Sequence, residues 1–302
     1  MTTFFQLLIY GLQLGSVYAL LALGYTMVYG IVGMINFAHG DFLMIGALST
    51  VFLAMAFMNT SSAALSAIQV ITIILIAMIG TGLIGVLVEA IAYKPLRDRP
   101  RMTALITAVG VSMFLQNFPR ALPFIGPNPR PFPRLFPLVQ LNLGGVTITS
   151  TQLIMLGLSI ILMVILYFIV NKTPLGAQMR AVSMDKDAAL LMGININVII
   201  SLTFFIGAAL ASSSGIFYAS IYPQVDVYMG SWLGTKSFIA AVLGGIGDIR
   251  GAMLGGFILG ISEIFATSIN SNLGYMIGFI VLILILLFKP AGLLGKFSIE
   301  KV

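Results

Sequence analysis

The sequence predicts an all-α, polytopic membrane protein, and both its composition and its long apolar runs point to that fold class. Of the 302 residues, 59% are hydrophobic and only 8% are charged, and the mean hydropathy is +1.09. A water-soluble domain needs far more charge to cover its surface. Several apolar runs approach or exceed the roughly 20 residues that cross a bilayer as a helix. Because lipid offers no partner to backbone N–H and C=O groups, runs of this length must be helical.

Eight apolar runs follow one another along the chain. They cover residues 4–33, 35–58, 64–93, 103–119, 151–171, 195–220, 235–269 and 273–289. The seventh run would form a helix about 52 Å long, whereas the hydrocarbon core of a bilayer is only about 30 Å thick. Since Gly247, Asp248, Arg250 and Gly251 stand near the middle of this run, we expect the helix to break there.

Lysine and arginine residues indicate which helix ends face the cytoplasm, where membrane proteins concentrate them. Three basic groups are expected on that side: Lys94, Arg97, Arg99 and Arg101; Lys172, Arg180 and Lys186; and Lys289, Lys296 and Lys301. Three runs separate the second group from the third, and only an even number of crossings returns the chain to the same side. The break in 235–269 supplies the missing crossing.

The first run leaves two arrangements open. Three runs precede the first basic group, so Met1 lies outside if the run 4–33 is one helix. If this run also breaks, the chain has ten segments, five in each half, and Met1 lies inside. An odd number of helices per half gives an inverted repeat, a common plan among transporters. We therefore expect a single transmembrane domain over 1–302, with about eight to ten transmembrane helices, some of them broken.

Six prolines exclude a spanning helix from the segment 120–150, because proline interrupts the hydrogen bonding inside a helix. They are Pro123, Pro127, Pro129, Pro131, Pro133 and Pro137. We expect this segment to be the longest external loop and to cover the outer end of the bundle as a semi-rigid cap.

The segment 172–194 carries the signals of a compact helical hairpin on the cytoplasmic side. Thr173 can cap a first helix, Pro174 suits its first position, and residues 175–182 can follow as helix. A solvated loop with capped ends would show the same signals, so these residues alone do not choose between such a loop and a docking element.

A second short helix is expected in the same hairpin. Ser183 can cap it, and Asp185 and Asp187 then fall in its first turn, where acidic side chains are favoured by the helix dipole. Gly193 suits the end of this helix, because glycine readily adopts the left-handed conformation that ends many helices.

The residues Asn36, Phe37, His39, Gly40 and Asp41 form a polar motif between two apolar runs. Ionisable groups at membrane depth are costly and usually face a cavity or a partner. Three interpretations stay open: the motif caps and pairs locally at a helix end, it lines or gates a pathway at a helix break, or His39 relays protons. The relay is the weakest of these, because His39 is the only histidine in the chain.

Glycines spaced by four residues predict close helix packing, since small residues let two backbones approach within a membrane. This spacing occurs at Gly11, Gly15 and Ala19, at Gly247, Gly251 and Gly255, and at Gly256 and Gly260. The expected packing positions around the break are Gly244, Gly245, Gly247, Gly251 and Gly255. We favour packing over a direct role in a pore, and the spacing does not say whether the partner helix belongs to this chain.

Two isolated acids and one turn complete the charged positions. Glu89 is expected at the membrane interface near Lys94, and Glu263 has no evident partner in the sequence. Asp248 and Arg250 are expected in a solvated turn at the membrane surface rather than as an intramembrane ion pair, because residues two apart do not share a helix face.

Several function classes are excluded by what the sequence lacks. Without cysteine the chain has no disulfide, thiolate nucleophile or cysteine-bound metal. No phosphate-binding loop of the G-x-x-x-x-G-K-[ST] kind is present, so we expect no ATP hydrolysis by this chain. We predict no catalytic residues, no metal and no cofactor. The net charge of +6 arises from basic residues at segment ends and does not indicate nucleic-acid binding.

Three segments, read in order, resemble one known family. They are Gly33-Met34-Ile35-Asn36-Phe37-Ala38-His39-Gly40-Asp41, the hairpin pattern T-P-L-G-x-x-x-R-A-x-x-x-D-x-D-A-A-x-x-x-G-I that starts at Thr173, and the stretch A-A-V-L-G-G-I-G at 240–247. Together they are similar to the branched-chain amino acid ABC transporter permease family, H-type subunit. The similarity spans most of the chain, from Leu14 to Gly295. Asp248 departs from the family pattern, because many members carry a small polar residue there.

This resemblance implies a permease subunit, multi-pass in the bacterial inner membrane, that moves branched-chain amino acids while partner subunits hydrolyse ATP. The implied partners are a second homologous permease, cytoplasmic ATP-binding subunits in a pair, and a periplasmic or lipid-anchored substrate-binding protein, with membrane lipid around the chain. A urea or other small-solute ABC permease of the same family is the alternative. A secondary transporter with its own ion site is the rival from another class.

The resemblance also implies roles for the two motifs. The residues Asn36 to Asp41 would mark the translocation pathway. The hairpin would dock onto an ATP-binding subunit through Gly176, Arg180, Ala181, Asp185, Asp187, Ala188, Ala189 and Gly193. In that role Gly176 would let the partner's surface approach closely, Arg180 would donate to its carboxylates or carbonyls, and Ala188 with Ala189 would present a flat face.

Overall fold

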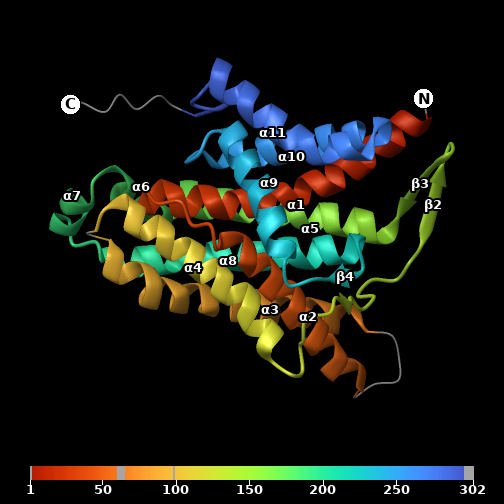
Figure 1. Cartoon of the computed structure of the whole chain (residues 1–302), viewed down its shortest axis with the longest axis horizontal. Helices are drawn as coiled ribbons and strands as arrows, with labels where there is room; N and C mark the ends of the chain where they lie inside the picture. Colours follow the sequence, from red (N-terminus) through yellow and green to blue (C-terminus); the bar gives the residue numbers. More distant parts are fainter. Residues whose placement is uncertain (1, 60–64, 98, 296–302) are drawn as a thin grey trace.

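Long helices lie side by side along one axis of the molecule, and short elements close the two ends of the bundle (Figure 1). The computed structural model describes residues 2–59, 65–97 and 99–295. Within this part of the chain, eight helices are long and apolar enough to cross a membrane, so the all-α polytopic prediction is confirmed. They are α1 (Thr2–Val32), α2 (His39–Asn59), α3 (Ala67–Val88), α4 (Arg101–Ala121), α5 (Ser150–Lys172), α8 (Ile196–Ile221), α10 (Ile249–Ile269) and α11 (Ser271–Phe288).

Shorter elements extend or connect these helices. A π-helix (Glu89–Tyr93) and a 3-10 helix (Lys94–Leu96) continue α3. The helices α6 (Pro174–Met184) and α7 (Lys186–Leu191) form the predicted hairpin, at the end of the bundle that lies on the left of Figure 1 and that we call the hairpin end. The strands β2 (Gln140–Leu143) and β3 (Val146–Thr149) lie at the opposite end, which we call the proline-rich end.

The helix α1 is continuous over 31 residues and forms the centre of the bundle. Most of its residues from Gly11 onward are buried. It packs against α10 through glycines: a Cβ on Gly256 would stand 2.4 Å from the Cα of Ala19, and a Cβ on Gly260 would stand 2.3 Å from the Cα of Gly15. The four-residue spacing therefore joins two helices of the same chain, and no larger side chain fits at this contact.

The run 235–269 breaks where expected. The helix α9 (Met229–Gly244) ends there, and α10 begins at Ile249 after a turn in which Gly245 has a φ of +106° and Gly247 a φ of +97°. Backbones also meet across the break, because a Cβ on Gly244 would stand 2.0 Å from the carbonyl oxygen of Gly251. Gly247 differs from its neighbours, since a Cβ there would meet nothing within 4 Å. Its glycine is required by the backbone conformation and not by packing.

The two charges at the break do not pair by a hydrogen bond or short ion contact within the described residues. The carboxylate of Asp248 accepts a hydrogen bond from the Gly251 N–H at 2.8 Å and caps α10. The guanidinium of Arg250 donates to the hydroxyl of Tyr167 on α5. Asp248 thus makes a local capping contact, whereas Arg250 contacts another helix.

The start of α1 lies at the proline-rich end. The Nε2 of Gln6 donates to the carbonyl oxygen of Thr147 in β3 at 3.0 Å, and the Thr147 N–H donates to the Oε1 of Gln6 at 2.9 Å. Since α1 does not break, the arrangement that needs a second break in the run 4–33 is wrong. The short helix α9 adds a further segment within the bundle, between Tyr228, which contacts Arg120, and Gly247, which lies next to Gly30.

The proline-rich segment is partly ordered by strands. The strands β2 and β3 form an antiparallel hairpin whose turn is made by Gly144 and Gly145, both with positive φ. The short strand β1 (Arg130–Pro131) pairs with β4 (Gln224–Val225), which follows α8. This pairing ties the segment to the connection between α8 and α9, so it covers that end of the bundle.

Candidate translocation and docking sites

The motif begins in the turn between α1 and α2, where Gly33 has a φ of +75°. The side-chain oxygen of Asn36 accepts hydrogen bonds from the Ala38 N–H at 3.0 Å and from the hydroxyl of Tyr93 at 2.6 Å. The first contact is a local cap, as one interpretation expected. The second reaches the π-helix that ends α3, so Asn36 also fixes the turn to another part of the bundle.

The next two residues are enclosed by glycines of other helices. The imidazole of His39 is 1% exposed, and it lies so close to α1 that a Cβ on Gly24 would stand 2.2 Å from its Nε2. A Cβ on Gly40 would stand 2.3 Å from the carbonyl oxygen of Gly230 and 2.8 Å from the Cα of Gly234. The start of α2 is therefore in backbone contact with α9.

The acid of the motif is held by a side chain of α4. The Oδ1 of Asp41 accepts a hydrogen bond from the Nε2 of Gln116 on α4 at 3.0 Å, and its Oδ2 has no partner within the described residues. The same is true of the Nε2 of His39, so the described chain offers it no proton acceptor or donor. Phe37 alone of the five predicted residues is exposed, at 42%, and its ring lies 6.2 Å from that of Phe238. The motif joins α2 to the π-helix that continues α3, to α4 and to α9, and four of its five residues are buried.

The hairpin begins as the sequence predicts. The Thr173 hydroxyl accepts a hydrogen bond from the Gly176 N–H at 3.2 Å, and Pro174 holds the first helical position of α6. Gly176 itself does not face outward. It is buried against the end of α5, where a Cβ would stand 2.1 Å from the carbonyl oxygen of Val170. The expectation that Gly176 admits a partner's surface is therefore wrong, because its own neighbouring helix fills that space.

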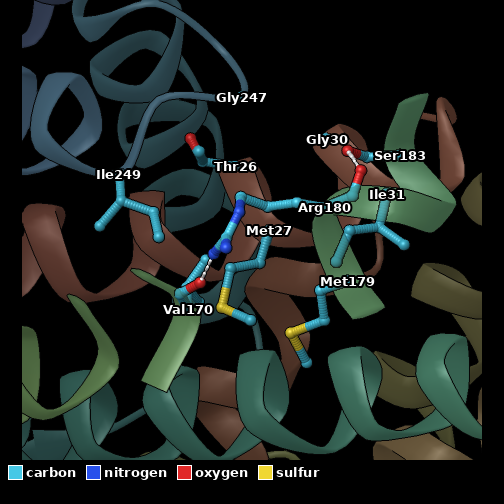
Figure 2. Close-up of a pocket in the computed structure, with 10 residues that line it drawn as sticks. All are labelled: Thr26, Met27, Gly30, Ile31, Val170, Met179, Arg180, Ser183, Gly247 and Ile249. Atoms are coloured by element: carbon cyan, nitrogen blue, oxygen red, sulfur yellow. Dashed lines mark hydrogen bonds between the residues drawn. The ribbon is translucent and has the colours of Figure 1, made fainter. Parts of the chain in front are cut away.

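Arg180 also faces the bundle. Figure 2 shows its side chain extending from α6 across a pocket towards Thr26 and Val170, and its guanidinium donates to the Val170 carbonyl oxygen. Other residues from α1, α6 and the start of α10 line this pocket, among them Met27, Met179 and Ile249. We expected the guanidinium of Arg180 to donate to a partner subunit. In this conformation it donates to the end of α5 instead.

The second helix of the hairpin differs from the prediction at its start. Asp185, not Ser183, caps α7, because its Oδ1 accepts a hydrogen bond from the Ala188 N–H at 3.0 Å. The Ser183 hydroxyl instead donates to the carbonyl oxygen of Arg180. Gly193 ends the hairpin with a φ of +80°, as expected.

The outer surface of the hairpin is apolar, which the sequence analysis did not identify. Asp187 and Ala188 are exposed and Ala181 is half-buried, whereas Ala189 is only 3% exposed and cannot share a flat face with Ala188. The large exposed side chains are Met184, Leu190, Leu191 and Met192, with exposed fractions between 60% and 88%. We call these four residues the apolar tip. Apolar side chains this exposed on a short hairpin indicate an interaction surface.

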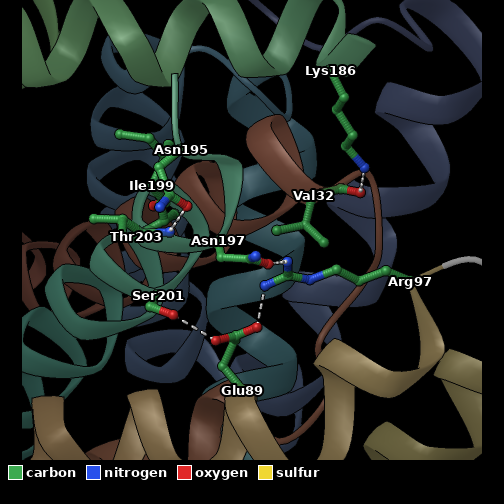
Figure 3. Close-up of polar contacts among 10 residues, drawn as sticks. Val32, Glu89, Arg97, Lys186, Asn195, Asn197, Ile199, Ser201 and Thr203 are labelled. Atoms are coloured by element: carbon green, nitrogen blue, oxygen red, sulfur yellow. Dashed lines mark hydrogen bonds and ion pairs between the residues drawn. The ribbon is translucent and has the colours of Figure 1, made fainter. Parts of the chain in front are cut away.

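A polar cluster links the hairpin end to the π-helix (Figure 3). Glu89 forms an ion pair with Arg97, and its Oε2 accepts a hydrogen bond from Ser201 of α8 at 2.7 Å. Arg97 also donates to the Oδ1 of Asn197 at 2.6 Å. The sequence analysis placed Glu89 at the membrane interface near Lys94, whereas the structure buries its side chain and gives it Arg97, directly after the 3-10 helix, as its cation.

The second isolated acid also has a partner. The Oε1 of Glu263 on α10 lies 2.5 Å from the Nζ of Lys236 on α9, and its Oε2 accepts a hydrogen bond from Tyr18 of α1 at 2.9 Å. Lys236 was not singled out from the sequence. The signal was nevertheless there, since one run contains both an isolated cation and an isolated anion, and charges inside a membrane usually pair.

The fold and these sites define a class: a multi-pass membrane protein whose motif holds several helices together and whose hairpin lies at one end of the bundle. Comparison with known proteins then identifies the family. The family described as branched-chain amino acid transport system / permease component matches residues 7–286, and the chain belongs to it.

Individual relatives agree with this assignment. The high-affinity branched-chain amino acid transport system permease protein BraD of Pseudomonas aeruginosa is 39% identical over 313 residues, which cover 99% of this chain and 98% of that protein. The corresponding protein LivH of Escherichia coli is 39% identical over 309 residues, with the same coverage. A probable LivH of Methanocaldococcus jannaschii is 27% identical over 297 residues, covering 91% of this chain and 88% of that protein. No solved structure matches the chain.

Proposed function

We propose that this chain is the transmembrane permease subunit through which an ABC importer moves branched-chain amino acids. The observation that carries the proposal is the 39% identity that covers 99% of this chain and 98% of BraD, a branched-chain amino acid permease by name. The aligned span covers the helices, the motif and the hairpin together. A permease component works with other components of its ABC system, and those partners supply ATP hydrolysis because this chain has no phosphate-binding loop.

The proposed partners follow from the two ends of the bundle. Basic residues gather at the hairpin end, where Lys172, Arg180 and Lys186 lie in or beside the hairpin, so this end faces the cytoplasm and a pair of ATP-binding subunits. The segment 120–150 faces outward, towards a periplasmic or lipid-anchored binding protein that delivers the substrate. A second, homologous permease completes the pathway.

The docking surface that we propose differs from the one in the sequence analysis. The apolar tip of Met184, Leu190, Leu191 and Met192 makes the main contact, and the exposed side chains of Asp185, Asp187 and Ala188 border it. Exposed Met and Leu side chains pack well into a groove of a partner, because they bury a large apolar area there. Gly176 and Arg180 act on the other side of the hairpin, where they hold it to the bundle.

The same contacts explain how movement of the hairpin reaches the pathway. Gly176 and Arg180 attach α6 to Val170 at the end of α5, and the Nζ of Lys186 lies 3.5 Å from the carbonyl oxygen of Val32 at the end of α1. A pull on the hairpin therefore acts directly on α5 and α1. Since α1 leads into the motif through a turn of a few residues, the motif is well placed to open and close the pathway.

Reconstitution tests this function. Proteoliposomes that contain this chain with its homologous permease, ATP-binding subunits and binding protein should accumulate radiolabelled leucine when ATP is present on the hairpin side. Liposomes with this chain alone should accumulate none, whether ATP, a sodium gradient or a proton gradient is supplied. Uphill uptake by the lone chain would contradict the proposal, and uptake of urea in place of leucine would favour the small-solute alternative.

A further inference from the structure

The ion pair of Lys236 and Glu263 lies in an unusual environment. Both residues are largely buried, with exposed fractions of 7% and 9%. The Nζ of Lys236 lies 4.9 Å from the ring centre of Trp232 and 5.5 Å from that of Tyr275. A cation over aromatic faces is stabilised by their quadrupoles, so these rings hold the ammonium group without using its N–H donors.

The ammonium group retains unused donors. A lysine side chain offers three N–H groups, and within the described residues the hydrogen bond from Nζ goes to Glu263. The carboxylate of Glu263 is held from its other side by the hydroxyl of Tyr18, which is fully buried. The pair thus consists of one positioned anion and one cation that can accept a further negative partner.

The rings around the pair form an accessible apolar surface. Trp232 is 40% exposed and Tyr275 is 67% exposed, although the ion pair beneath them is buried. Tyr218 of α8 continues this surface, with its ring 5.7 Å from that of Trp232. The charges therefore lie at the base of a partly open aromatic cluster and not in the middle of a sealed core.

The pair lies nearer to the proline-rich end. Glu263 is six residues from the end of α10, and at 1.5 Å per residue it lies about 9 Å inside that end. Its partner Lys236 lies midway along the shorter helix α9.

Packing alone gives no reason for charges at this position. The helices α9 and α10 already meet through backbone contacts, since a Cβ on Gly255 would stand 2.1 Å from the carbonyl oxygen of Ala240. Replacing a buried ion pair by apolar side chains is often neutral or stabilising, and ionisable groups in a membrane usually mark a functional site.

We propose that Lys236 and Glu263 form a transient binding site for the zwitterionic head of an α-amino acid. Lys236 binds the α-carboxylate and Glu263 binds the α-ammonium group. The aliphatic side chain packs on the rings of Trp232 and Tyr275. When the substrate binds, Lys236 and Glu263 each leave the other and pair with the opposite charge of the substrate. The net charge of the site stays the same, and no charge is left unpaired in the membrane. This inference rests on the proposed function, because it deepens the substrate class.

The single tryptophan of the chain makes a direct test possible. Trp232 lies within the proposed site, so its fluorescence should change saturably when leucine is added to the chain in phosphatidylglycerol nanodiscs, which contain no zwitterionic headgroup. Isoamylamine lacks the carboxylate and 4-methylpentanoate lacks the ammonium group, and each should bind at least about tenfold more weakly than leucine. Absence of a saturable change with leucine would overturn the inference, as would equal responses to all three compounds.

Variants distinguish binding from a structural role. Lys236→Met and Glu263→Gln should each abolish the fluorescence response. The double variant Lys236→Met, Glu263→Gln leaves no isolated charge, so a merely structural pair predicts that its leucine uptake returns to the wild-type level. The binding site predicts that the double variant folds and retains the ATP-binding subunits but takes up leucine about tenfold more slowly or worse.

The outcomes separate this inference from the proposed function. Wild-type uptake by the double variant, or a response kept by both single variants, would overturn the binding site while wild-type leucine uptake still supported the permease. If the wild-type assembly failed to take up leucine although Trp232 responded to it, the proposed function would fail and the amino-acid site would stand.

Discussion

Gly176 of α6 lies against Val170 of α5 so closely that a Cβ on the glycine would stand 2.1 Å from the Val170 carbonyl oxygen. The same carbonyl oxygen accepts a hydrogen bond from Arg180. Two residues of the hairpin thus meet one residue at the end of α5. The hairpin is therefore attached firmly to the end of α5. The residues that attach it, Gly176 and Arg180, differ from those of the apolar tip.

Adding one methyl group at this contact tests the attachment of the hairpin. Gly176→Ala should destabilise the chain by about 1–3 kcal/mol, because the new Cβ overpacks the end of α5. Thermal unfolding of the purified chain in detergent measures this change. Ala177→Leu is the matched control, since Ala177 is exposed on the same turn and the extra volume points to solvent. Equal melting temperatures for Gly176→Ala and the wild type would show that the hairpin is not held there.

The apolar tip should carry the affinity for the ATP-binding subunits. Leu191→Asp and Met192→Asp should each weaken co-purification of these subunits about tenfold or more, because a charge cannot be buried in an apolar contact. Leu191 is 88% exposed and Met192 82% exposed, so folding of the chain should not change. Gln178→Asp places the same charge on an exposed position of α6 outside the tip and should retain the subunits. Full retention by both tip variants would locate the docking surface elsewhere.

The contact between α2 and α9 should not tolerate a side chain. Gly40→Ala places a methyl group against the carbonyl oxygen of Gly230 and should cost about 1–3 kcal/mol of stability. Gly80→Ala is the control: a Cβ there meets nothing within 4 Å, so this exchange in α3 should be neutral or should stabilise by roughly 0.5–1 kcal/mol. Thermal unfolding of the two purified variants measures the difference. Similar changes in stability for both variants would argue against a close contact between α2 and α9 at Gly40.

Asp41→Asn separates the charge of the motif from its hydrogen bond. The asparagine oxygen can still accept from Gln116, so assembly with the ATP-binding subunits should remain intact. Leucine uptake should fall about tenfold or more if the buried charge takes part in the pathway. Uptake at the wild-type rate would leave local capping and packing as the whole role of the motif. His39→Gln should be milder, because no described partner reaches its Nε2.

The sides of the membrane can be assigned in this cysteine-free chain. A cysteine at Asn142 in β2 and one at Met184 in the apolar tip should react with a membrane-impermeant thiol reagent from opposite sides. Met184 is 87% exposed, and Asn142 is also exposed, so both positions are open to the reagent. In intact cells only the Asn142→Cys variant should be labelled. Labelling of both from one side would refute the arrangement of the two ends.

Sequence signals predicted the features that depend on local chemistry. The spans follow from apolar length, the break before α10 follows from Gly247 and Asp248, and the hairpin follows from Thr173 and Gly193. The strand pair β2–β3 was missed, although Gly144-Gly145 is a recognised two-residue turn signal between short strands.

Partners distant in sequence could not be predicted in the same way. Glu263 pairs with Lys236, which is 27 residues away across a helix break, and Asn36 pairs with Tyr93, which is 57 residues away. Such pairs depend on how helices cross, and apolar periodicity contains no information about crossing when most faces are apolar. The direction of Arg180 was missed for a related reason, since the free carbonyl oxygens at the end of α5 compete with any partner for its donors.

The π-helix at the end of α3 sets the direction of the residues that follow it. A π turn contains one residue more than the α turn that it replaces, and this one holds both Glu89 and Tyr93. If the same residues formed an α turn instead, the residues that follow would be rotated by roughly 100°, the angle that one residue spans in an α-helix. Tyr93 would then turn away from Asn36, and Arg97 would turn away from Glu89. A switch of this turn from π to α would therefore disconnect the motif from the hairpin end without altering any of the side chains that join them.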